Sequence, residues 1–152
     1  MLRSDPGEWR RAIKAMAAGL DPEVAVLIGR GDPTGHHPVR LSLAGCRETL
    51  RLYEDQVVAL PTDEATRTAI QQDLKEAITL LHLKVEIVRA LQHASPKRRV
   101  FFEGPLALPG GEVRVEIKGA VGVRGTAVQA RTYGEAVRRL HQQIVKDPNL
   151  RT

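Results

Sequence analysis

Apolar residues recur at helical spacing over residues 62–94, the longest regular stretch of the chain. They lie three or four positions apart with charged and polar residues between them, which predicts one long amphipathic helix. The apolar positions are Ile70, Leu74, Ala77, Ile78, Leu81, Val85, Val88 and Leu91. Thr62 is expected to cap this helix, and Pro96 to end it, because proline disfavours helical geometry in the residue before it.

A second helix is predicted immediately before the long one, over residues 43–60. Leu43, Cys46, Leu50, Tyr53, Val57 and Leu60 show the same three-four spacing. Because only a short connection around Pro61 separates the two helices, an antiparallel helical hairpin is favoured. The second helix is the shorter one, so either the sheet or a second copy of the protein must cover the far end of the long helix. In the second case we expect self-association through Leu81, Val85, Val88 and Leu91.

The first forty residues predict a short helix and two strands. Asp5-Pro6 is typical of a helix start, and an apolar stripe follows it. This stripe consists of Trp9, Ile13, Met16 and Ala17. Residues 23–28 predict a buried strand and residues 39–43 a returning strand, which form a hairpin joined by a loop rich in glycine and proline.

This loop, residues 29–38, contains three clustered candidates for metal binding or catalysis, namely Asp32, His36 and His37. A metal site is one alternative, but adjacent histidines on an extended segment project in different directions, and no further cluster completes a ligand set. Acid–base catalysis is another, but no nucleophile or oxyanion donor accompanies them. We therefore expect a flexible solvated loop, no metal, no cofactor and no enzymatic activity.

The last third of the chain predicts an antiparallel sheet followed by a helix. Residues 100–103, 113–118, 121–124 and 128–131 are the expected strands, because apolar and polar residues alternate in them. Thr132 and Glu135 have the spacing of a capping box that starts the final helix. Its buried face is expected to carry Tyr133, Val137, Leu140 and Ile144. If this helix covers the valine face of the sheet, the opposite face is left to solvent.

Length and composition favour one soluble domain. The 152 residues contain 42% hydrophobic and 27% charged side chains, as expected for a globular protein. We expect a single α+β domain over residues 1–152: a mixed part at 1–61, the long helix at 62–94, and a basic sheet with a C-terminal helix at 95–152. The architecture would be a helical hairpin packed with a small antiparallel sheet, with short helices at both termini. No segment predicts a membrane span or a signal peptide, so a cytoplasmic location is expected.

Positive charge is concentrated near the C-terminus. The chain has a net charge of +5, whereas residues 95–152 alone carry +6. The candidate nucleic-acid-binding residues are Lys97, Arg98, Arg99, Phe101, Arg114, Lys118, Arg124 and Arg131. Arginine and lysine can neutralise phosphates, and an aromatic ring can stack on a base.

The leading interpretation is a non-enzymatic, basic, self-associating protein that contacts DNA or RNA phosphates through its C-terminal sheet. Two observations oppose it: only 3% of the residues are aromatic, and Glu103, Glu112 and Glu116 interrupt the basic surface. The alternative is a structural or assembly subunit that binds no nucleic acid and uses the long helix and the sheet edges as protein interfaces.

Overall fold

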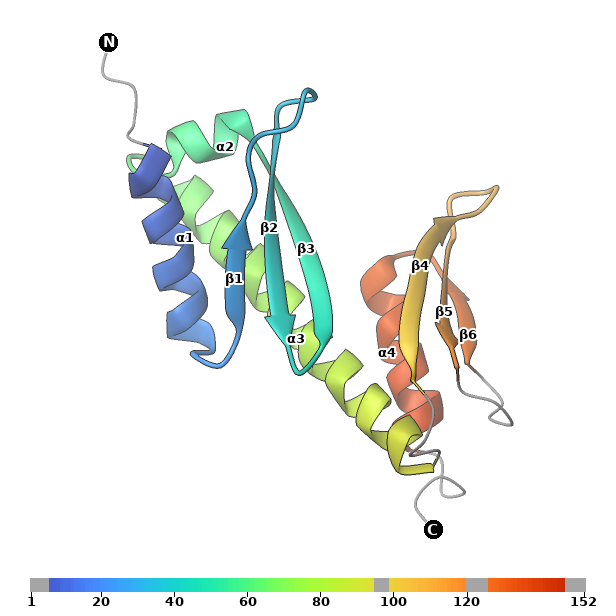
Figure 1. The fold of residues 1–152 in the computed structure, drawn as a ribbon. Coiled ribbons are helices and arrows are strands. Elements are labelled where there is room, and N and C mark those ends of the chain that lie inside the picture. Colours follow the sequence, from blue (N-terminus) through green and yellow to red (C-terminus); the bar gives the residue numbers. More distant parts are fainter. Residues whose placement is uncertain (1–5, 95–98, 120–125, 147–152) are drawn as a thin grey trace. The chain divides into compact units, whose positions relative to one another are not determined.

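The fold is α+β, with one long helix and two antiparallel three-stranded sheets (Figure 1). The computed structural model describes residues 6–94, 99–119 and 126–146. The elements in chain order are α1 (Pro6–Leu20), β1 (Ala25–Ile28), β2 (His36–Leu43), β3 (Cys46–Tyr53), α2 (Glu54–Ala59), α3 (Glu64–Ala94), β4 (Phe101–Ala107), β5 (Val113–Lys118), β6 (Ala127–Ala130) and α4 (Tyr133–Val145). The chain divides into two compact units, an N-terminal unit (Met1–Leu81) and a C-terminal unit (His82–Thr152).

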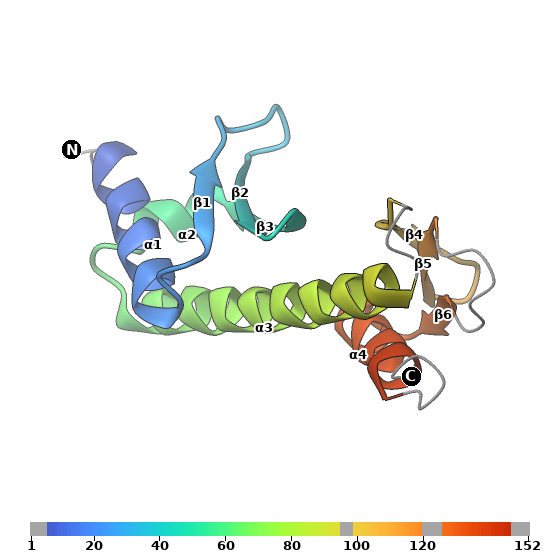
Figure 2. The same ribbon diagram turned by 60° about the horizontal axis from the view of Figure 1, so that its bottom comes forward.

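In the N-terminal unit, helices cover one face of the sheet β1-β2-β3. Helix α1 and the first part of α3 lie on the same side of this sheet (Figures 1 and 2). Val39 and Leu41 of β2 and Leu52 of β3 are almost fully buried on that side. From α1, the predicted stripe residues Trp9, Ile13 and Ala17 are also buried. One face of the sheet therefore belongs to the core, and the opposite face is open.

The predicted helix over residues 43–60, and with it the helical hairpin, is wrong over most of its length. Residues up to Leu43 belong to β2, residues 46–53 form β3, and only the six residues of α2 are helical. Two residues with positive φ, Ala44 at 49° and Gly45 at 83°, join the strands in a tight turn. Positive φ at both central residues is the geometry that connects twisted antiparallel strands. Cys46, Leu50 and Leu52 of this segment fit a period of two, and pairing with β2 selects the strand.

The long helix is confirmed as α3, with one correction at its start. Asp63 is the residue before the first helical position, and its side chain accepts a hydrogen bond from the backbone N–H of Ala65 at 3.2 Å. It also accepts one from the Thr66 hydroxyl at 2.7 Å. Asp63 rather than Thr62 is therefore the capping residue, since it satisfies an N–H group that the helix leaves unpaired.

In the C-terminal unit, α4 and the second part of α3 pack on the valine face of β4-β5-β6. The core contains Ile87 and Leu91 from α3, Val115, Ile117 and Val128 from the sheet, and Ala136, Leu140 and Ile144 from α4. The Thr132 half of the predicted capping box is confirmed: the Thr132 side chain accepts a hydrogen bond from the N–H of Glu135 at 3.2 Å. The Glu135 carboxylate accepts a hydrogen bond from Arg139 at 2.9 Å. The strand predicted at 121–124 lies outside the described residues, as does Asp5.

No helix in the described part of the chain combines the length and apolarity needed to cross a membrane.

Candidate nucleic-acid interface

The outer face of the C-terminal sheet carries the predicted basic residues of β5. Strand pairing places Phe101 opposite Lys118, Glu103 opposite Glu116, and Arg114 opposite Gln129. Cross-strand partners share a face of the sheet, and the intervening residues point to the helices. Arg114 and Lys118 therefore lie on the solvent side.

An aromatic side chain accompanies these cations. Phe101 is 50% exposed, and it is the direct cross-strand neighbour of Lys118. The side chains of Arg114 and Lys118 are themselves 40% and 45% exposed. An exposed ring beside an exposed ammonium group could contact a base and a phosphate of one strand at the same time.

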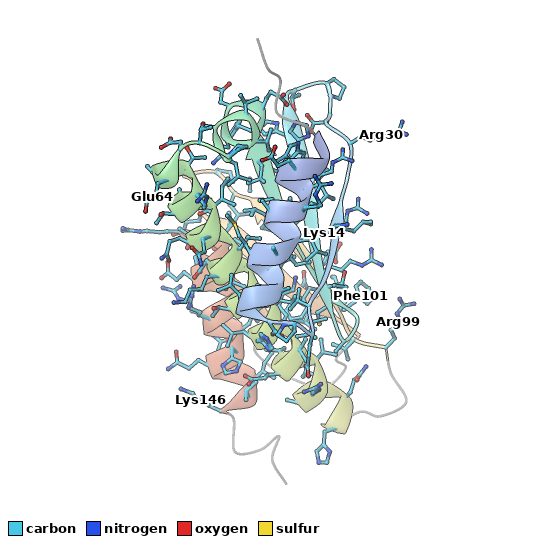
Figure 3. The ribbon with its side chains drawn as sticks, turned by 90° about the vertical axis from the view of Figure 1, so that its left-hand side faces the viewer. Lys14, Arg30, Glu64, Arg99, Phe101 and Lys146 are labelled. Atoms are coloured by element: carbon cyan, nitrogen blue, oxygen red, sulfur yellow. The ribbon has the colours of Figure 1, made fainter. Side chains whose placement is uncertain are left out.

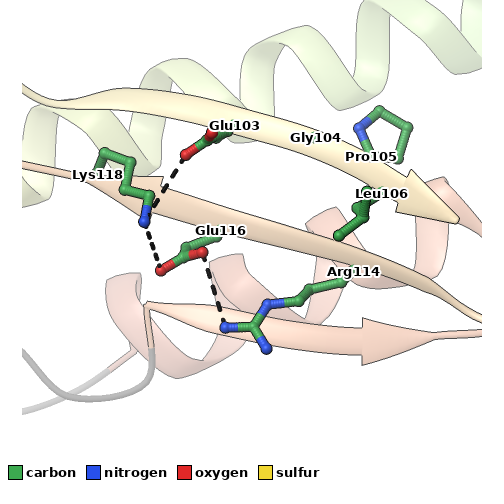
Figure 4. A pocket seen from close by; sticks show the side chains of 7 residues that line it. All are labelled: Glu103, Gly104, Pro105, Leu106, Arg114, Glu116 and Lys118. Atoms are coloured by element: carbon green, nitrogen blue, oxygen red, sulfur yellow. Dashed lines mark hydrogen bonds and ion pairs between the residues drawn. The ribbon is translucent and has the colours of Figure 1, made fainter. Parts of the chain in front are cut away.

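The same face also carries carboxylates that pair with both cations (Figure 4). The ammonium group of Lys118 lies 3.2 Å from Glu116 Oε1 and 3.8 Å from Glu103 Oε2. The Arg114 guanidinium lies 3.7 Å from Glu116 Oε2. Half-exposed pairs of this kind add little to stability. Their effect here is electrostatic: two positive and two negative side chains leave this group of four residues without net charge.

A shallow hollow of about 230 Å³ lies over these residues. Gly104, Pro105 and Leu106 complete its wall, together with the four charged side chains (Figure 4). The strand pairing shifts between Glu103 and Leu106, so β4 bulges at this place. A side chain at position 104 would not fit, because a Cβ there would lie 2.7 Å from the carbonyl oxygen of Arg114. The hollow is smaller than typical small-molecule sites of roughly 300–1,000 Å³.

Arg99 and Arg131 are the other predicted basic residues that the structure describes. Arg99 precedes β4, whose Phe101 pairs with the last residue of β5, whereas Arg131 follows Ala130, which pairs with the first residue of β5. The two arginines therefore lie at opposite ends of the sheet. Both are exposed, and Arg99 stands clear of the ribbon in Figure 3. Lys97, Arg98 and Arg124 lie outside the described residues.

The predicted self-association residues lie mainly in the interior of the chain. Leu81, Val85 and Leu91 are at most 3% exposed, and Leu91 belongs to the core of the C-terminal unit. Val88 is partly exposed. Three of these four residues are therefore buried within the chain, and Val88 is the one whose side chain is partly exposed.

The loop with Asp32, His36 and His37 has a structural explanation. The Asp32 carboxylate accepts hydrogen bonds from the N–H groups of Thr34 and His36, both at 3.0 Å, and from the Thr34 hydroxyl at 2.6 Å. The Thr34 hydroxyl contact, followed by the His36 N–H, lowers the pKa of Asp32. These bonds shape the turn that leads into β2.

The two histidines of this loop lie on opposite faces of β2, as alternation requires. The His36 ring contacts Tyr53 on the outer face, with centroids 4.6 Å apart, whereas His37 contacts Trp9 and the carboxylate of Glu54. Within residues 6–94, 99–119 and 126–146, no three potential metal-binding side chains gather at one place. Asp32 and His36 lie together, with Asp32 Oδ1 3.8 Å from His36 Nδ1, whereas His37 lies on the other face of β2.

The bulge at residues 104–106 and the hollow beside it were not predicted from the sequence. A Gly-Pro pair inside an apolar stretch is a signal for such a break, since proline cannot donate to the sheet and glycine permits unusual backbone angles. Comparisons with protein-family models, with curated proteins and with solved structures find no match to this chain.

Proposed function

We propose that this protein is a non-enzymatic nucleic-acid-binding protein that contacts phosphates through the outer face of its C-terminal sheet. The observation that supports this most is the exposed Phe101 directly opposite Lys118, with Arg114 on the same open face. Arginine and lysine side chains contact nucleic-acid phosphates, and an exposed ring on a sheet can stack on an unpaired base.

Glu103 and Glu116 compete with phosphate for these cations. Their ion pairs with Lys118 and Arg114 are partly exposed, so exchanging a carboxylate partner for a phosphate costs little free energy. The exchange leaves two carboxylates near the bound nucleic acid. The affinity of this face for nucleic acid would therefore be modest and strongly dependent on salt.

Titration of fluorescently labelled oligonucleotides, followed by anisotropy at low and near-physiological salt, tests the proposal. The variant Arg114→Gln/Lys118→Gln is expected to weaken binding and to reduce the salt slope by about 1.4 for a single strand, or about 1.8 for duplex DNA. Lys75→Gln/Arg89→Gln is the matched control, because it removes two exposed cations from α3. If both variants lose the same affinity, binding depends only on the net charge of the chain, which would contradict a site on this sheet.

The competing proposal is an assembly subunit that binds a protein through the long helix and the sheet edges. Two exposed apolar side chains of β4 favour it, Phe101 and Leu106, which are 50% and 60% exposed. Self-association through the long helix has less support, because it relies on Val88. Light scattering across a wide concentration range is the test: a mass of one chain throughout excludes a homo-oligomer, and loss of a larger mass in Val88→Asp would support one.

A further inference from the structure

The outer face of the N-terminal sheet is also basic, and it differs from the C-terminal sheet in one respect. Pairing of β1, β2 and β3 places Arg40, Arg47 and Arg51 on this face, and all three are exposed. The other outward residues are Ala25, Leu27, His36, Pro38, Ser42, Thr49 and Tyr53. None of the outward positions of the strands at residues 25–28, 36–43 and 46–53 is acidic.

The three arginines are neighbours. Arg40 on β2 lies opposite Thr49 on β3, so Arg47 and Arg51, two residues to either side, are its diagonal neighbours. Such neighbours lie about 7–8 Å apart, and like charges at this separation repel. Antiparallel sheets often have charged outer faces, but an ordinary one mixes both signs, as β4 and β5 do in the same chain. A cluster of one sign only is typical of a surface that receives an anion.

Exposed rings and apolar groups flank the cluster. Tyr53, at the end of β3, is 58% exposed, and its ring contacts that of His36 across the strand pair. Leu27, cross-strand to Arg40, is 64% exposed. The bases of a duplex are stacked inside the helix and cannot lie on such groups, whereas a single strand can present its bases to them. Arg30, in the loop that follows β1, is also exposed and stands clear of the ribbon (Figure 3).

We infer that the outer face of the N-terminal sheet binds single-stranded nucleic acid, with Arg40 and Arg51 contacting phosphates and Tyr53 stacking on a base. This site goes beyond the proposed function, since it lies on a different sheet and does not depend on binding by Arg114 and Lys118. Arg40 and Arg51 face outward, and no outward strand position of this sheet carries a carboxylate that would compete with phosphate for them. The Asp32 carboxylate lies 3.8 Å from His36 Nδ1, beside Tyr53 and away from the arginines' positions on the strands.

The test is a titration of the full chain with labelled oligo(U), oligo(dT) and a duplex of the same length, at two salt concentrations. For Arg40→Gln/Arg51→Gln we expect a loss of single-strand affinity and a salt slope smaller by about 1.4. Tyr53→Ala should lose roughly tenfold in affinity with the salt slope unchanged, since stacking is not ionic. Arg40→Lys/Arg51→Lys should keep the salt slope, which separates loss of charge from misfolding. Comparison of the affinities for oligo(U) and oligo(dT) shows whether the site prefers RNA or DNA.

Variants on the two sheets separate this inference from the proposed function. If Arg114→Gln/Lys118→Gln abolishes binding and Arg40→Gln/Arg51→Gln leaves it unchanged, the N-terminal site is wrong and the proposed one stands. If Arg40→Gln/Arg51→Gln abolishes binding and Arg114→Gln/Lys118→Gln leaves it unchanged, only the N-terminal site is supported. Duplex affinity equal to single-strand affinity would overturn the inference, as would binding to anionic lipid vesicles without binding to oligonucleotides.

Discussion

The ammonium group of Lys84 donates a hydrogen bond to the hydroxyl of Tyr133 at 3.0 Å, which joins the second part of α3 to the start of α4. Lys84 is only 8% exposed, and its ammonium also lies 5.0 Å from the centre of the Phe102 ring. A buried charge is retained only where polar and aromatic partners replace its water. The hydrogen bond between Lys84 and Tyr133 therefore stabilises the C-terminal unit.

Tyr133→Phe is expected to lower the free energy of unfolding by about 1.5–3 kcal/mol, because it removes a hydrogen bond to a charged group. Urea denaturation measures the change. Tyr53→Phe is the matched control, since Tyr53 is exposed and its substitution should stay within about 0.5 kcal/mol of the wild type. Lys84→Met should cost less than Tyr133→Phe, because it removes the buried charge and keeps an apolar side chain of similar length. Equal stability of Tyr133→Phe and the wild type would contradict this role.

The turn between β2 and β3 offers a stabilising substitution. Ala44 has φ of 49°, a left-handed conformation that costs an L-residue with a Cβ about 1–2 kcal/mol. Asparagine tolerates this conformation and favours such turns, so Ala44→Asn should raise the free energy of unfolding by about 0.5–1 kcal/mol. Ala18→Asn, on the exposed side of α1, should lower it by about 0.6 kcal/mol. Thermal or urea unfolding distinguishes the opposite signs, and a destabilised Ala44→Asn would show that this turn geometry is wrong.

This turn also explains why sequence reasoning failed in its neighbourhood. In residues 46–53, Cys46, Glu48 and Leu52 are buried and Arg47 and Arg51 are exposed, a period of two. The same residues carry apolar side chains at intervals of three and four, so periodicity alone cannot choose between helix and strand. The pairing with β2 decides, and it depends on residues that a local pattern does not include. The arginines of this face were overlooked for the same reason.

The elements that were predicted correctly have patterns with a single interpretation. The stripe from Ile70 to Leu91 is too long for a strand, and strict alternation from Val113 to Lys118 has no helical counterpart. For the candidate site, the alternation of apolar and polar residues predicted that Arg114 and Lys118 lie on the open face. The sequence also showed that Glu116 lies between them and interrupts the positive charge. The ion pair of Glu103 with Lys118 joins β4 to β5, so it depends on the strand register, which a local sequence pattern does not include.

Acid should weaken the turn that Asp32 organises. Hydrogen bonds to its carboxylate hold the pKa of Asp32 below its ordinary value. A carboxyl group with a lowered folded-state pKa stabilises the folded state above its unfolded pKa, and this contribution disappears as pH falls through the folded pKa. The stability difference between the wild type and Asp32→Ala should therefore shrink as pH falls from about 5 to about 2. Urea unfolding across this range measures the difference, and an NMR titration of the Asp32 carboxyl group that shows an ordinary or raised pKa would contradict it.

Removing the competing carboxylates should strengthen phosphate binding by the C-terminal sheet. Glu116 pairs with both Lys118 and Arg114, and Glu103 pairs with Lys118. Glu103→Gln/Glu116→Gln keeps the size of both side chains and leaves two cations without opposing charge on this face. Binding of single-stranded oligonucleotides at low salt should tighten, with a steeper salt dependence, because each phosphate contact contributes about 0.7 to the slope.

The control for this gain must add the same charge elsewhere. Asp73→Gln/Glu64→Gln removes two exposed carboxylates from α3 and raises the net charge equally. If it tightens binding as much as Glu103→Gln/Glu116→Gln does, the gain comes from long-range attraction and the C-terminal face is not the contact surface. A gain confined to Glu103→Gln/Glu116→Gln, and lost again when Arg114→Gln/Lys118→Gln is added, would place the phosphates beside these two cations. The four-residue variant is the stricter test. If the tighter binding came only from long-range attraction to the more positive chain, part of it would remain after Arg114 and Lys118 are replaced.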